Sequence, residues 1–184
     1  MSAIAPVSVR AMHPGEFSAM RELSMAAFDG DEQIGKLLDA LHGSWAWDDD
    51  LSFVAESAGE LVGHVLYTHA ILDAPSRQVD VLVLAPVGVR PAVQRRGIGT
   101  RLITESLGVL ATLPEPLVFL EGHPSYYPRF GFRPGADLGF TAPSVRIPRD
   151  AFMVYPLPAH EEWMTGALVY PDAFWRTDSV GLRD

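Results

Sequence analysis

The feature that most constrains this chain is a pair of glycines between an apolar segment and an amphipathic one. Residues 79–89 are almost wholly apolar and predict a buried central strand, whereas residues 97–111 repeat apolar side chains at helical spacing. Gly97 and Gly99 let the backbone adopt conformations denied to other residues and approach a ligand closely. The free N–H groups of the first helical turn then point at one spot, an arrangement that binds phosphate or pyrophosphate.

Three known phosphate-binding motifs are alternative interpretations of this segment. A Walker loop ends in Gly-Lys-Ser or Gly-Lys-Thr, and the chain has no such ending. A dinucleotide fingerprint needs a third glycine where Leu102 stands, and its glycines follow the strand directly, whereas seven residues separate Val89 from Gly97. The third pattern is the pyrophosphate loop of acyl-coenzyme A transferases, matched here by Gln94, Arg95, Arg96, Gly97, Ile98 and Gly99. The alternative is a tight helix start that binds no ligand.

A second motif about 30 residues later reads Leu-Glu-Gly-His-Pro-Ser-Tyr-Tyr-Pro-Arg-Phe-Gly-Phe, from residue 120 to residue 132. With both motifs in this order, the chain resembles the GNAT superfamily of N-acetyltransferases, whose second signature is a Tyr followed four residues later by Gly-Phe. Tyr127, Gly131 and Phe132 match that signature. The doubled tyrosine, and the tail at residues 166–174, resemble the YhbS-like branch of predicted acetyltransferases. The resemblance covers roughly residues 7–175 and leaves no second domain over.

The order of elements predicts the fold class. Strands are expected at 7–12, 51–56, 61–72, 79–89, 117–121 and 151–157, and helices at 14–28, 34–41, 97–111 and, as a short helix or turn, 124–130. Strands and helices interleave around an early antiparallel hairpin, which indicates an α/β (α+β) protein with helices on both faces of a mixed sheet. Pro86 predicts a bulge or a lapse in pairing. The resemblance implies a largely antiparallel sheet, splayed between strands 4 and 5, in one domain (core about 7–157, aromatic tail 158–184 packed on it).

The resemblance also implies a cosubstrate and its site. Acetyl-coenzyme A would enter the splay, with the pantetheine arm on the backbone of strand 4 and the pyrophosphate on the amides of residues 95–100. The cofactor-binding residues expected are Val87, Gly88, Val89, Gln94, Arg95, Arg96, Gly97, Ile98, Gly99 and Thr100. The expected reaction is direct acetyl transfer from the thioester to an amine of a small molecule or peptide.

Such a reaction needs several proton transfers. A free amine has a pKa near 10, so it must lose a proton before it attacks. A backbone N–H near residues 87–89 could stabilise the oxyanion. By the family pattern, Tyr127 donates a proton to the departing thiolate, because a phenol and a thiol have similar pKa values. The alternative for Tyr127 is a packed core tyrosine. Tyr126 is a second candidate for the acid, but it is interpreted as structural.

The general base is left open by the sequence. Glu121 ends the predicted fifth strand, where some family members place a glutamate. A chain of water molecules would serve as well, and His64 and His123 are further candidates. A different class of function also remains, in which the chain is a non-catalytic acyl-coenzyme A-binding module or sensor.

The charge is concentrated in two parts of the chain. Basic residues number 14 and acidic residues 23, which gives a net charge of −9. Nine acidic residues lie between Asp29 and Glu60 with Lys36 as the only basic one, so a cationic acceptor would suit this segment, although it could equally be a solvated face. Four arginines lie between Arg90 and Arg101, beside the two glycines, and suggest an anion site.

Other classes are disfavoured by what the sequence lacks. The net charge argues against nucleic acid and anionic membranes as partners. No run reaches 18 apolar residues, no targeting segment appears, and there is no Cys, so a cytoplasmic protein, monomer or homodimer, is expected. His64 and His69 are five apart on a predicted strand and would face opposite ways, and no His-Glu-x-x-His occurs, so no metal is expected.

Overall fold

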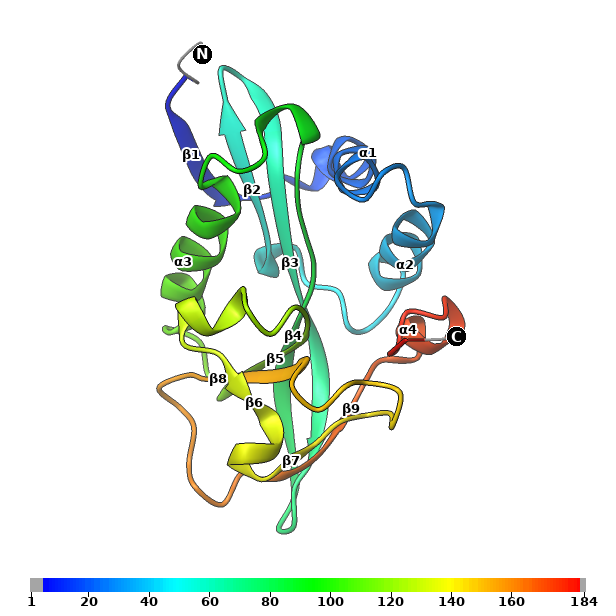
Figure 1. The fold of residues 1–184 in the computed structure, drawn as a ribbon, viewed down its shortest axis with the longest axis vertical. Helices are drawn as coiled ribbons and strands as arrows, with labels where there is room; N and C mark the ends of the chain where they lie inside the picture. The colour runs from blue at the N-terminus through cyan, green and yellow to red at the C-terminus, as the bar shows by residue number, and fades with distance from the viewer. Residues whose placement is uncertain (1–4, 183–184) are drawn as a thin grey trace.

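The computed structural model describes residues 5–182, which form a mixed sheet flanked by helices (Figure 1). The strands are β1 (Val7–Ala11), β2 (Ser52–Ser57), β3 (Glu60–Asp73), β4 (Gln78–Val89), β5 (Leu117–Glu121), β6 (Arg133–Pro134), β7 (Phe140–Thr141), β8 (Phe152–Pro156) and β9 (Gly166–Val169). The helices are α1 (Phe17–Ala27), α2 (Glu32–His42), α3 (Ile98–Leu110) and α4 (Asp172–Arg176).

The sheet runs in the order β1-β2-β3-β4-β5-β8-β6, with β9 pairing to both β3 and β7. Within the described residues, the β4–β5 and β7–β9 pairs are parallel and every other pair is antiparallel. The predicted mixed, largely antiparallel sheet is therefore confirmed.

Helices cover both faces of the sheet, as predicted. Side chains alternate along β4, so that Val81 and Val83 point into one core cluster and Leu82 points into the other. Buried residues of α1, α2 and α4 fill the first cluster, and α3 packs its apolar face, including Leu102 and Ile103, into the second. The two cores fix the position of α3 relative to α1 and α2 on opposite faces (Figure 1).

The sheet splays where β4 and β5 part. These strands pair only at Leu82 with Val118 and at Val83 with Phe119. Just beyond, the register of β4 on β3 shifts, so that Ala85 and Pro86, joined by a cis peptide bond, stand as a bulge in the ladder. Proline lacks the N–H that a continuing ladder needs. The lapse in pairing predicted from Pro86 is thus confirmed, and it lies just beyond the point where β4 and β5 part.

The C-terminal part belongs to the sheet rather than lying loosely upon it. Strand β9 pairs with the end of β3, and the chain then passes to α4, which Figure 1 shows beside α2. Tyr170 and Phe174 are buried there with their rings stacked 4.8 Å apart. The last two residues of the expected tail, 183–184, lie outside the described residues.

One predicted element begins at the wrong place. The short helix expected at 124–130 is the 3-10 helix η4 (Tyr127–Phe130), and Pro128, not Pro124, stands in its first turn. Pro128 is the second residue of η4, and its fixed φ and missing N–H are tolerated in a first helical turn. Of the described segments, none forms a helix that is both long and apolar enough to cross a membrane.

Candidate active site

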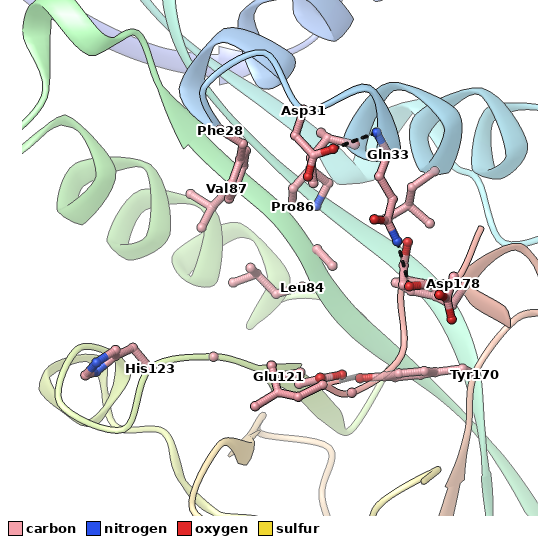
Figure 2. Close-up of a pocket in the computed structure, with 18 of the residues that line it drawn as sticks. Phe28, Asp31, Gln33, Leu84, Pro86, Val87, Glu121, His123, Tyr170 and Asp178 are labelled. Carbon is pink, nitrogen blue, oxygen red and sulfur yellow. Dashed lines mark hydrogen bonds between the residues drawn. The ribbon is translucent and has the colours of Figure 1, made fainter. Parts of the chain in front are cut away.

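The parting of β4 and β5 opens a cavity of about 800 Å³. Its walls come from the junction of α1 and α2, from residues 84–87 of β4, from the end of β5 and the loop after it, and from the chain that follows β9 (Figure 2). A cavity of this size is typical of sites for small molecules. Among the sequence-predicted site residues, Val87, Glu121 and Tyr127 line it.

The start of α3 forms the second part of the expected coenzyme site. The helix begins at Ile98, directly after Gly97, whose φ of +82° lies in the left-handed region that favours glycine. Gly97 has no side chain to cap the helix, so the first backbone N–H groups of α3 are left for a ligand or solvent. Arg95, with a φ of +60°, and Arg96 are exposed beside them. The positive end of the helix and these guanidinium groups are features that attract an anion, and we call this place the candidate anion site.

The predicted residues of β4 and the loop connect these two parts. Val87 borders the cavity, whereas Gly88 is buried where a Cβ would lie 2.8 Å from Cβ of Ala27 in α1. The Gln94 side chain donates a hydrogen bond to the Val89 carbonyl at 3.0 Å, which ties the loop to the end of β4. The backbone of the predicted pantetheine strand therefore leads from the cavity, through the loop at residues 90–97, to the start of α3.

Tyr127 stands at the far wall of the cavity, in the first turn of η4. Its ring lies over Gly122, because a Cβ on residue 122 would come within 2.9 Å of the Tyr127 ring carbon Cδ2. The rings of Tyr126 and Phe132 meet it edge to face, with centroids 5.1 Å and 5.8 Å away. Burial raises the pKa of Tyr127 to about 12, so the hydroxyl keeps its proton throughout the neutral range.

Tyr126 joins the cavity to the candidate anion site. It lines the cavity, and its hydroxyl lies 3.2 Å from the place that a Cβ of Gly99 would occupy, in the first turn of α3. The guanidinium of Arg129 stacks over its ring, with Cζ 4.6 Å from the ring centroid, and holds the ring in place. No local pattern in the sequence indicates this position of Tyr126 beside the start of the helix.

Glu121 ends β5 at the floor of the cavity, where Figure 2 shows it facing Tyr170. The Tyr170 hydroxyl and the backbone N–H of Gly181 lie near its carboxylate. Burial raises the pKa of Glu121 above its usual value, while these two polar groups and the charge of Arg146 oppose the shift. A carboxylate with a raised pKa is a better proton acceptor at neutral pH than an exposed one.

The other two candidate bases lie in different surroundings. His64 is fully buried in the core between Ser24 and Ser52, and burial lowers its pKa to about 3. It does not line the cavity. His123 does line the cavity and is exposed, with Nδ1 2.9 Å from the Ser125 hydroxyl.

The cavity is also lined by residues that the two sequence motifs do not predict. Phe28, Asp31 and Gln33 come from the junction of α1 and α2, which the sequence marks only as acidic. Tyr170, Phe174, Asp178, Ser179, Gly181 and Leu182 come from the C-terminal chain. In the sequence, Tyr170 and Phe174 could be noticed only as aromatic residues of the tail. No local sequence pattern indicates that Gly181 lines the cavity.

The charge around the cavity is negative. Asp31, Glu121 and Asp178 line it, and no Lys or Arg is found among the described lining residues. Asp31 also caps α2 by accepting a hydrogen bond from the Gln33 backbone N–H at 2.9 Å. No cluster of three or more His, Asp or Glu side chains that could hold a metal ion occurs in residues 5–182.

Comparison with known proteins gives the same family as the motifs. Residues 8–135 match the family model of the acetyltransferase (GNAT) domain. A curated relative, the uncharacterized N-acetyltransferase YjhQ of Escherichia coli (strain K12), is 33% identical over 154 residues, which cover 82% of this chain and 78% of YjhQ.

Solved structures share the fold along nearly the whole chain. The GNAT family N-acetyltransferase YhbS from Escherichia coli, in complex with CoA, superposes with a TM-score of 0.82 at 23% identity, over 96% of this chain and 95% of that one. A GNAT family acetyltransferase from Brucella melitensis, in complex with acetyl-CoA, superposes with a TM-score of 0.73 at 27% identity, over 92% and 98% of the two chains. With its two motifs, its splayed sheet and these matches, the chain belongs to the GNAT family of acetyltransferases.

Proposed function

We propose that this protein transfers the acetyl group of acetyl-coenzyme A to a primary amine of a small molecule or peptide. The observation that carries the proposal is the cavity at the splay, which is bordered by Val87 on β4, by Glu121 at the end of β5 and by Tyr127 in the loop after it. The two solved relatives hold CoA and acetyl-CoA respectively, which supports the same cosubstrate here. The open start of α3 fits the pyrophosphate, and the backbone of residues 87–89 fits the pantetheine arm.

In the proposed mechanism the neutral amine attacks the thioester carbonyl directly. A new C–N bond forms and the C–S bond breaks, while a backbone N–H of residues 87–89 stabilises the negative charge on the carbonyl oxygen. The amine proton passes to Glu121, directly or through water. The leaving thiolate takes its proton from Tyr127, whose hydroxyl burial keeps protonated, and solvent then returns a proton to Tyr127 and removes one from Glu121. The products are an acetamide and the free thiol of coenzyme A.

The negative lining supports a cationic acceptor. An ammonium or second amino group would be attracted by Asp31, Glu121 and Asp178, and no described lining residue supplies a positive charge to bind an acidic acceptor. We also propose that the reaction takes place in the cytoplasm, where the coenzyme is produced, and that residues 7–157 with the tail at 158–184 act as one domain.

The test compares Tyr127→Phe with the wild type. The variant removes one hydroxyl and keeps the ring over Gly122. Coenzyme binding, measured by titration calorimetry with acetyl-coenzyme A, is expected to be unchanged. Amine-dependent release of the thiol is expected to fall by about 10²-fold or more, the usual contribution of a general acid. Tyr155→Phe, at a half-buried tyrosine of β8 that does not line this cavity, is the matched control.

Each outcome separates the two functional classes. Binding without turnover in the wild type, over a panel of amines, would favour the acyl-coenzyme A-binding module over the enzyme. Turnover that Tyr127→Phe leaves intact would reject Tyr127 as the acid. Glu121→Gln keeps an acceptor oxygen near Tyr170 but no longer takes up a proton. This variant is expected to lower kcat and to abolish the fall of kcat toward acidic pH.

A further inference from the structure

A short segment after α4, residues 177–182, crosses from α2 to the opposite half of the splayed sheet, and we call it the C-terminal strap. At its first end it is bound to α2. The Gln33 side-chain Nε2 donates hydrogen bonds to the carbonyls of Thr177 at 2.9 Å and Asp178 at 2.6 Å. Figure 2 shows Gln33 reaching down to Asp178 at the edge of the cavity. One side chain of α2 thus fixes two successive carbonyls of the strap.

The other end of the strap is bound to the half of the sheet beyond β5. The Arg146 guanidinium donates to the Val180 carbonyl at 2.8 Å, and the backbone N–H of Leu182 donates to the Arg146 carbonyl at 3.2 Å. Between these two contacts, the backbone N–H of Gly181 lies near the carboxylate of Glu121. The strap is therefore held at both ends by hydrogen bonds from different elements.

Gly181 permits this close approach. Its φ of +65° lies in the left-handed region, and a Cβ there would lie 2.7 Å from the Cβ of Arg146. Any other residue at 181 would both strain the backbone and push the strap away from Arg146. The glycine is thus required by the contact that closes this end.

The strap lies on the side of the cavity away from the coenzyme loop. Figure 1 shows α3, at whose start the candidate anion site lies, and α4, from which the strap runs, on opposite sides of the splay. Asp178, Ser179, Gly181 and Leu182 of the strap all line the cavity. If the coenzyme enters beside α3, the strap borders the space that remains for the acceptor.

We infer that the C-terminal strap is the wall that limits the acceptor to small amines and excludes the lysine side chains of peptides and proteins. The inference rests on the proposed function and restricts the proposed acceptors to small amines. A polypeptide needs an open groove along which its chain can lie, and the strap connects α2 with the turn before β8 at that place. The cavity must also hold the thioester end of the coenzyme, which leaves room for a small acceptor only. Asp31 and Asp178 face this space and suit a short diamine.

Bisubstrate probes test the inference by binding alone, without need of turnover. In both probes the sulfur of coenzyme A carries an acetyl linker. In the diamine probe the linker carbonyl forms an amide with 1,4-diaminobutane. In the peptide probe it forms an amide with the lysine side chain of a blocked hexapeptide. Titration calorimetry gives the dissociation constant of each probe and of coenzyme A itself. The wild type is expected to bind the diamine probe at least about tenfold more tightly than the peptide probe.

Two strap variants and one control complete the design. Gln33→Ala removes the two hydrogen bonds at the first end, and Gly181→Ala forces the other end away from Arg146. Each is expected to bind the peptide probe more tightly and to reduce the preference by about 3–10-fold. Gln78→Ala, at an exposed position at the start of β4, is expected to keep the preference of the wild type.

The possible failures are distinguishable. Equal binding of both probes by the wild type, or an undiminished preference in both strap variants, overturns the role of the strap. A chain that does not bind coenzyme A at all overturns the proposed function, and the inference falls with it. If Gly181→Ala does not fold, Gln33→Ala alone still decides, because it alters only a side chain of α2.

Discussion

Lowering the pH from about 7.5 to about 5.5 should destabilise this protein by about 1.4 kcal/mol through one residue, His64. The imidazole is fully buried beneath α1, with the hydroxyl of Ser24 3.3 Å from Nδ1 and that of Ser52 2.9 Å from Nε2. A neutral imidazole satisfies both contacts with one donor and one acceptor nitrogen. Burial lowers the pKa of His64 from 6.5 to about 3, so a second proton is strongly disfavoured in the folded state.

The sign and the size follow from the two pKa values. Above the unfolded pKa of 6.5, His64 is neutral in both states and does not affect stability. Between pH 6.5 and about pH 3, His64 binds a proton in the unfolded chain but stays neutral in the folded protein. The free energy of unfolding therefore decreases as the pH falls. At about pH 5.5 the unfolded histidine is roughly 90% protonated, and the linkage relation gives a loss of about 1.4 kcal/mol.

The assay is urea unfolding at both pH values, for the wild type and for His64→Gln. Glutamine cannot titrate in this range, and it keeps a polar atom near Ser52. The variant will be less stable at both pH values, but the pH-dependent change in its free energy of unfolding should be smaller than that of the wild type by about 1.4 kcal/mol. His13→Gln makes the same replacement at an exposed histidine and is the matched control.

An equal pH dependence in the wild type and in His64→Gln would refute the reasoning, because the other titrating groups are common to both chains. The pH window also avoids most carboxylates, whose pKa values lie near 4. Glu16, for example, has its pKa lowered to about 2 by its hydrogen bond with Arg10 and stays ionised throughout. The result bears on function, since His64 pairs with Gly88 across β3 and β4, in the expected pantetheine strand.

Two further predictions concern the tyrosines of the cavity. Gly122→Ala should push the ring of Tyr127 out of place, so kcat should fall by about tenfold or more while the dissociation constant for acetyl-coenzyme A, measured by calorimetry, stays the same; an unchanged kcat would contradict the packing described. Tyr126→Phe removes the hydroxyl that lies against Gly99. We expect the affinity for acetyl-coenzyme A to fall by about 3–10-fold, and the affinity for acetyl-pantetheine, which has no phosphates, to stay constant; equal losses for both ligands would place the hydroxyl on the pantetheine arm instead.

Much of the fold could be predicted because its signals are local. The apolar run of β4, the helical spacing of α3 and the glycine between them lie within consecutive residues, so periodicity and turn chemistry identify them. Strand β5 has the predicted bounds. Strands β6, β7 and β9 were not predicted, because two to four residues carry no periodicity and are held in place by their partners in the sheet.

The candidate site divides in the same way. The motifs place Tyr127, Glu121 and the helix start, since each motif is a short run of sequence. The acceptor side depends on contacts such as that of Gln33 with Asp178, which are 145 residues apart. No local pattern indicates such a pair. The need for glycine at 181 likewise arises only from the approach of Arg146.

The acidic segment shows how a sequence-level charge can mislead about a site. Of the nine acidic residues between 29 and 60, all within the described chain, Asp31 is the one that lines the cavity. Others form ion pairs away from it, such as Asp39 with Arg21 and Glu56 with Arg10. The remaining negative charge of the cavity comes from Glu121 at the end of β5 and from Asp178 in the strap. The proposed attraction for a cationic acceptor therefore depends on three carboxylates from three separate elements, and two of them lie outside the segment that the composition marks as acidic.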